Sequence, residues 1–136
     1  MPTITRFEEI EAWKTARELT RRVYSLTEQG QFTKDFGLKN QIQRASVSVM
    51  SNIAEGFESR TQAQFLEYLG RSKASAGEVR CQLYIALDLK YLVQEQFDQV
   101  FDLGDKSSRQ IARFMDYLET HPQSRRVREE GPVYEV

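Results

Sequence analysis

The chain has 136 residues, of which 40% are hydrophobic and 29% charged, and its 19 basic and 20 acidic residues leave a net charge of −1. This balance suits one ordinary folded domain and excludes a surface that binds phosphate all over, although a local basic patch is still allowed. No apolar run approaches the roughly 18 to 20 residues that cross a bilayer, the N-terminus lacks the layout of a secretory signal, and the single cysteine cannot form an internal disulfide, so we expect a cytoplasmic protein without a membrane segment.

The first predicted element is a helix over residues 6–28. Thr5 and Glu8 fit a capping box at its start, and Gly30 follows its end. Apolar residues recur behind this box at steps of three and four, the period of one helix face: Ile10, Trp13, Ala16, Leu19, Val23 and Leu26.

The second predicted helix covers residues 38–55, although its serine-valine alternation at 46–49 locally resembles a strand. Over the longer window the helical period prevails, because apolar residues recur at Leu38, Ile42, Ala45, Val49 and Ile53. We expect Gly56 to end this helix as a left-handed C-cap. Thr61 and Gln64 fit a second capping box immediately afterwards, so the pattern predicts a tight corner between two helices.

Two more helices are expected, over residues 62–92 and 95–120, both with inward apolar residues at steps of three and four. Residues 123–136 contain several arginines, a glycine and a proline, and we expect them to form a flexible C-terminal tail. Four amphipathic helices with short connections predict an all-α fold, an antiparallel up-down-up-down four-helix bundle over residues 1–122. Aromatic residues outside the main stripes indicate that part of the surface faces another subunit.

Three stretches carry a family resemblance: "FEEIEAWKTARELTRRVYSLT", "FGLKNQIQRASVSVMSNIAEGFES" and "FLEYLGRSKASAGEVRCQLYIALDLKYL". Over about residues 7–120 the chain resembles the bacterial four-helix-bundle proteins encoded in 23S rRNA intervening sequences, the S23 family. These are similar to the accessory variability determinants of diversity-generating retroelements. The chain departs from the common pattern at Met50, where many members have a proline, and at Gln43, where an arginine is common.

The resemblance implies a homo-oligomer, a ring of five bundles, with RNA or a nucleic-acid-processing protein as partner. It implies no established activity and no cofactor. The missing proline at Met50 predicts a straighter second helix, and Gln43 removes a positive charge that RNA binding would use.

The residues that could perform chemistry do not form a catalytic pattern. A di-metal site in a bundle needs inward carboxylates and Glu-x-x-His pairs, whereas the only histidine, His121, has Leu118 three residues before it and Pro122 after it. Arg113 and His121 are too far apart for the arrangement of helical ribonucleases. Cys81 follows the inward Val79 by two residues and is expected to be a small packing residue. We therefore expect no catalytic residues, no metal and no enzymatic activity.

A polar motif lies on the second and third helices, around the predicted corner: Arg44, Asn52, Glu55, Gly56, Ser75 and Glu78. One interpretation makes these residues a ligand site. The other, which we favour, makes them structural groups that cap the helix end and fix how the helices align, because desolvated polar groups must be paired.

Charged residues form two stripes. The basic stripe on the first helix is Lys14, Arg17 and Arg21, with Arg22 beside it, and the acidic stripe on the fourth helix is Asp98, Asp102 and Asp105. Three interpretations stay open. The basic stripe binds RNA phosphates, helped by Arg125, Arg126 and Arg128; the two stripes pair within or between subunits; or both are solvated faces.

The sequence therefore predicts a non-enzymatic oligomeric scaffold or binding protein, associated with RNA or a ribonucleoprotein. The alternative is a protein-protein adaptor that binds no nucleic acid and gains avidity from repeated docking faces.

Overall fold

Four long helices form most of the computed structural model, which describes residues 3–128 and 130–136. They are α1 (Glu11–Thr27), α2 (Phe36–Glu58), α3 (Gln62–Asp88) and α4 (Gln94–Thr120). Two short 3₁₀ turns, η1 (Phe7–Glu9) and η2 (Phe32–Lys34), precede α1 and α2.

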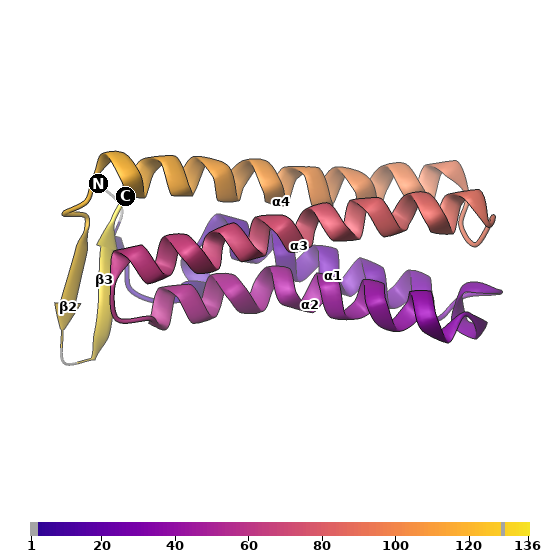
Figure 1. The fold of residues 1–136 in the computed structure, drawn as a ribbon, viewed down its shortest axis with the longest axis horizontal. Coiled ribbons are helices and arrows are strands. Elements are labelled where there is room, and N and C mark those ends of the chain that lie inside the picture. The colour runs from indigo at the N-terminus through magenta and orange to yellow at the C-terminus, as the bar shows by residue number, and fades with distance from the viewer. Residues whose placement is uncertain (1–2, 129) are drawn as a thin grey trace.

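The helices run alternately up and down, and each packs against two neighbours in the cyclic order α1, α2, α3, α4 (Figure 1). Their inward apolar residues are completely buried, among them Leu19, Val49, Leu69 and Ile111. The predicted four-helix bundle is confirmed. The bundle forms because apolar residues recur every three or four positions, so that every helix has one apolar face, and these faces pack together in a common core.

The start of α1 is organised by Glu9 and not by the predicted Glu8. The Glu9 carboxylate accepts hydrogen bonds from the backbone N–H groups of Thr5, at 2.9 Å, and Arg6, at 3.0 Å. These bonds, the one from the Thr5 backbone above all, lower the pKa of Glu9. The second capping box is present as predicted, because the Gln64 N–H donates to Thr61 Oγ1 at 3.1 Å.

The predicted C-cap at Gly56 is wrong, because α2 continues through it to Glu58 with right-handed backbone angles. The glycine serves a close approach instead. A Cβ atom at position 56 would lie 2.6 Å from Phe65 Cδ1 and 2.8 Å from Tyr68 Cβ, both on α3. Gly56 therefore lets the end of α2 lie directly against the first turns of α3.

Substituting Gly56 with alanine tests this contact. Alanine favours a helix by about 1 kcal/mol, but overpacking a filled core costs about 1–3 kcal/mol, so we expect a net loss of up to about 2 kcal/mol in the free energy measured by urea unfolding. Gly37 is the matched control, because it is also in α2 but exposed, and an added Cβ there meets only Asp35 Oδ1 at 3.7 Å. Equal stabilities for G56A and G37A would contradict the close-approach account.

The C-terminal segment is a β-hairpin, and the predicted flexible tail is wrong. Strands β2 (Arg125–Arg128) and β3 (Gly131–Glu135) pair antiparallel, with Arg126 opposite Val133. Strand β1 (Thr3–Ile4) adds to the other edge of β3, so the sheet order is β1-β3-β2. The sheet lies at the end of the bundle that holds the α2–α3 corner, and both chain ends are there (Figure 1).

Tyr134 ties this sheet to the bundle. Its ring is completely buried, 5.5 Å from the Phe57 ring and 5.0 Å from the Phe65 ring between centroids. Arg125 lies over its other side, with the guanidinium carbon 5.5 Å from the ring centroid. Burial raises the pKa of Tyr134 to about 12, with Arg125 opposing the shift. The large buried area of this ring, together with the buried Val133, holds the hairpin against the bundle.

Two substitutions at Tyr134 test the anchor. Tyr134→Ala removes a buried ring, so we expect a loss of about 3–5 kcal/mol in the free energy of unfolding. Tyr134→Phe is the control, because the hydroxyl is buried without a hydrogen-bond partner in the described part of the chain, and its removal costs nothing. If Y134A melted like the wild type in thermal unfolding, the hairpin would not be anchored as described.

Candidate functional site

The polar motif around the α2–α3 corner is only partly connected. Asn52 Nδ2 donates to the Ser48 carbonyl oxygen at 2.8 Å and to Ser48 Oγ at 2.9 Å, and Ser48 Oγ lies 2.8 Å from Ser75 Oγ on α3. Asn52 and Ser75 are therefore joined through Ser48, a residue that the sequence motif did not include. The chain of bonds crosses from α2 to α3 and fixes how the two helices align.

The three charged members of the motif point outward. Arg44, Glu55 and Glu78 are all exposed, and none of them forms an ion pair with another residue in the described ranges. Glu78 only accepts a hydrogen bond from Gln82 Nε2, at 3.1 Å. The hydrogen-bonded network thus contains Asn52 and Ser75. Gly56 contributes a close approach to α3, and the three charged residues lie outside the network.

A shallow hollow of about 430 Å³ lies over the motif, on the outer side of α2. Tyr24, Arg44, Asn52 and Glu55 are among its lining residues, with Val47, Ser48 and Ser51. The hollow is open to solvent, and the polar side-chain atoms of Asn52 and Ser48 are hydrogen-bonded to each other. A hollow this open does not enclose a small molecule.

Two further polar links between helices were missed by the sequence analysis. Ser72 Oγ donates to the Val49 carbonyl oxygen of α2 at 2.6 Å, and Thr20 Oγ1 donates to the Ser46 carbonyl oxygen at 3.0 Å. Both donors lie on the face of their helix that packs against a neighbouring helix. A serine or threonine at such a position is the signal that would have indicated them.

Ser48→Ala tests the bridge between α2 and α3. The substitution removes the partner of the Ser75 hydroxyl in a half-buried place, whereas the Asn52 amide keeps its bond to the carbonyl oxygen of residue 48, so we expect a loss of about 1 kcal/mol in the free energy of unfolding. Ser25→Ala on α1 is the control, because Ser25 is exposed and its side chain makes no hydrogen bond to another described residue. A chemical-denaturation series in which both variants match the wild type would contradict the bridging role.

The basic stripe is exposed along α1. Lys14 pairs with Glu11 at 3.1 Å and Arg21 with Glu18 at 3.5 Å, whereas Arg17 lies over the Trp13 ring, 5.7 Å from its centroid. These ion pairs join neighbours on one exposed helix, so they are weak and open to exchange. Arg22 points towards α4, where it donates to Gln99 Oε1 at 2.6 Å.

The acidic stripe lies on α4, and no ion pair between described residues joins α1 to α4. Asp105 pairs instead with Arg80 of α3, at 3.6 Å, and with Arg109 of its own helix, at 3.1 Å. Asp98 accepts a hydrogen bond from Gln94. The interpretation in which the two stripes pair inside one bundle therefore has no contact to support it.

The C-terminal arginines do not extend the basic stripe. Arg125 donates to the Ser59 carbonyl oxygen at the α2–α3 corner, and Arg126 pairs with Glu135 across the hairpin. The side chain of Arg128 lies outside the described part of the structure. Of the seven arginines and lysines predicted to contact RNA, the three of the basic stripe share one exposed helix, whereas the C-terminal ones belong to a hairpin at the bundle end.

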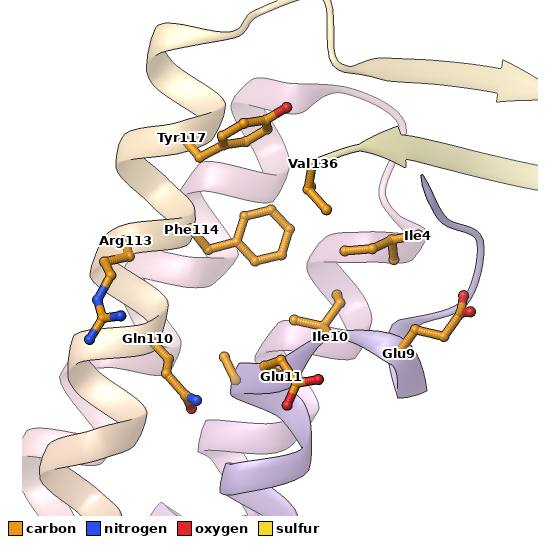
Figure 2. Close-up of a pocket in the computed structure, with 10 residues that line it drawn as sticks. Ile4, Glu9, Ile10, Glu11, Gln110, Arg113, Phe114, Tyr117 and Val136 are labelled. Carbon is orange, nitrogen blue, oxygen red and sulfur yellow. The ribbon is translucent and has the colours of Figure 1, made fainter. Parts of the chain in front are cut away.

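A second hollow, of about 500 Å³, lies between the start of α1 and the last turns of α4 (Figure 2). Ile4, Ile10, Phe114 and Val136 form its apolar part. The charged residues at its edge do not converge: Figure 2 shows Arg113 directed away from Glu9 and Glu11. Glu11 is paired with Lys14, and Glu9 is held by the cap of η1. This arrangement supplies no acid-base pair.

Other residues considered for chemistry are placed as follows. Cys81 is exposed, so the prediction of a packed cysteine is wrong; it points outward from α3 two residues beyond the buried Val79. His121 stacks on Tyr117, with ring centroids 4.2 Å apart. Among the described residues, no three His, Cys, Asp or Glu side chains gather closely enough to hold a metal ion, and no helix is long and apolar enough to cross a membrane.

The fold and this exposed polar surface are those of a small helical-bundle protein. Comparison with known families identifies the family to which the chain belongs. Residues 8–113 match the family of 23S rRNA-intervening sequence proteins, and the chain belongs to that family. A similar solved structure is a protein of unknown function of the S23 ribosomal protein family from Bacteroides thetaiotaomicron VPI-5482. It has a TM-score of 0.72 and 19% sequence identity, over 77% of this chain and 95% of that one. No curated protein matches the chain.

Proposed function

We propose that the chain is a non-enzymatic, oligomeric binding protein that associates with RNA or a ribonucleoprotein through the outer face of α1. The proposal includes the ring of five bundles that the family resemblance suggests. In such a ring every copy repeats the same weak site, so avidity replaces strong single contacts. The family description refers to the 23S rRNA intervening sequence.

The observation that carries the proposal is the mixture of cations and aromatic rings on α1. Arg17 and Arg21 are exposed, Trp13 is half-buried between them and Phe7, and Tyr24 is 41% exposed one turn further along. Cations that neutralise phosphates and rings that stack on unpaired bases are the usual combination in proteins that bind single-stranded RNA.

Charge reversal on α1 tests the RNA-binding face. We expect R17E/R21E to lose most of the affinity for a labelled single-stranded RNA in fluorescence polarisation, and wild-type affinity to fall as salt rises from about 50 to about 200 mM. K106E/R113E on α4 changes the net charge equally at two exposed positions and should bind like the wild type. Two results together would contradict the proposal. The first is a 260/280 nm absorbance ratio typical of protein without nucleic acid in a freshly purified sample, and the second is RNA binding that is absent or does not depend on salt.

A protein-protein adaptor is the second candidate, and exposed hydrophobic residues favour it. Tyr84 is 52% exposed although its ring packs 5.0 Å from the Phe97 ring, and Leu89 and Val93 are also exposed at that end of the bundle. Side chains of this size on a folded surface are typical of docking faces when they lie together. Wild-type protein that binds no RNA but retains its oligomeric state would favour this candidate.

A further inference from the structure

Four residues of α2 form a charged seam on its outer side. Arg44, Ser48, Ser51 and Glu55 follow each other at steps of four, three and four, so they share one face of the helix. Arg44 and Glu55 are exposed at the two ends, and the serines between them are half-buried and line the hollow of about 430 Å³. We call these four residues the α2 seam.

The neighbouring helix carries a seam with the opposite order of charges. Arg71, Ala74 and Glu78 are exposed on α3 at steps of three and four, and we call them the α3 seam. Read from the α2–α3 corner, the α2 seam begins with a negative residue and ends with a positive one, while the α3 seam begins with Arg71 and ends with Glu78. Each seam is therefore the electrostatic complement of the other.

The two seams also lie at matching heights along the bundle. Ser48 contacts Ser75 at 2.8 Å and Gln41 contacts Gln82 at 3.4 Å, and both contacts belong to one antiparallel register. In this register Arg44 is level with Val79, beside Glu78, and Asn52 is level with Arg71. Glu55 lies within one helical turn of Arg71 in height.

Within one chain these charges do not meet. No ion pair between described residues joins the α2 seam to the α3 seam. Arg71 pairs with Glu67 of its own helix, at 2.8 Å, and lies over the Tyr68 ring, 5.2 Å from its centroid. Complementary charges at matched heights, exposed on two adjacent helices and without an ion pair to each other, are available to pair with another copy.

We propose that the α2 seam of one copy docks on the α3 seam of the next, with Arg44 facing Glu78 and Glu55 facing Arg71 across the contact. This inference rests on the proposed oligomer and names its interface. A rotation axis parallel to the bundle keeps every residue at its own height, so the match within one chain becomes a match between neighbouring copies. Any rotation axis of this direction, twofold or higher, satisfies this match, and the mass of the assembly separates a dimer from a larger ring.

The small residues explain how the helices come close enough. Ser48 and Ser51 leave the hollow between Arg44 and Glu55, and Ala74 presents a small side chain at the middle of the α3 seam. Helix faces lined by serine and alanine permit short distances between axes, which brings the flanking charges within ion-pair range. The contact uses neither Arg17 nor Arg21, although Tyr24 of the α1 face also lines the hollow at the edge of the α2 seam.

Charge exchange tests the interface by light scattering coupled to size exclusion. We expect wild-type protein to have the mass of several chains, and R44E and E78R each to shift towards the mass of one chain at the same concentration. The double variant R44E/E78R should recover the wild-type mass, because the pair is restored with its signs exchanged. K106E is the control, and it should assemble like the wild type; circular dichroism confirms that each variant is folded.

The other outcomes are each informative. A wild-type protein that is a single chain at high concentration would overturn both the oligomer and this interface. An oligomeric wild type whose mass R44E and E78R leave unchanged would overturn the interface alone. Recovery of R44E by E55R and not by E78R would also overturn it, because that result indicates two α2 helices packed against each other around a twofold axis. RNA binding by R44E is expected to weaken, because single copies lose the avidity of the ring, and to recover together with the mass in R44E/E78R.

Discussion

The close approach of α2 and α3 is the constraint on which the rest of the structure depends. At one end Gly56 leaves no room for a Cβ atom between α2 and the Phe65 ring. In the middle Ser72 donates to the Val49 carbonyl oxygen, and Ser48 meets Ser75. Each of these contacts needs a small residue at one position, so the two backbones are held near each other along much of their length.

This constraint positions the other elements. Phe65 lies against Gly56, and its ring contacts both Phe57 and Tyr134, so the C-terminal hairpin is anchored on the corner that the glycine makes possible. The same alignment carries the serines inward and leaves Arg44, Glu55 and Glu78 on the outside. The residues of the polar motif are thus divided in the structure, because its small and amide residues make contacts inside the chain while its three charged residues are exposed.

The bundle could be predicted because apolar residues recur every three or four positions along the whole of every helix. The second capping box could be predicted because Thr61 and Gln64 lie three residues apart and form a local signal. The role of Gly56 could not be read locally. A glycine that ends a helix and one that admits a neighbouring ring look the same until the neighbour, here Phe65, is placed. The hairpin was missed for a related reason, since among the described residues of its strands only Val133 and Tyr134 are buried, too few residues to form a recognisable pattern.

Prediction of the site was limited by similar effects. Spacing placed Lys14, Arg17 and Arg21 on one face correctly, because a helix period is all that this requires. It could not show that Arg125 and Arg126 are engaged by Ser59 and Glu135, because those contacts depend on a hairpin that the sequence pattern did not indicate.

Native-state hydrogen exchange of the backbone amides tests the central constraint most directly, because it reports the free energy of opening for each segment. If the α2–α3 contact organises the fold, amides around Val49, Ile53, Leu69 and Ser72 will exchange slowest, at the rate of global unfolding, and G56A will speed their exchange before that of α1. Amides of α2 and α3 that exchange faster than those of α1 and α4 in the wild type would contradict the account.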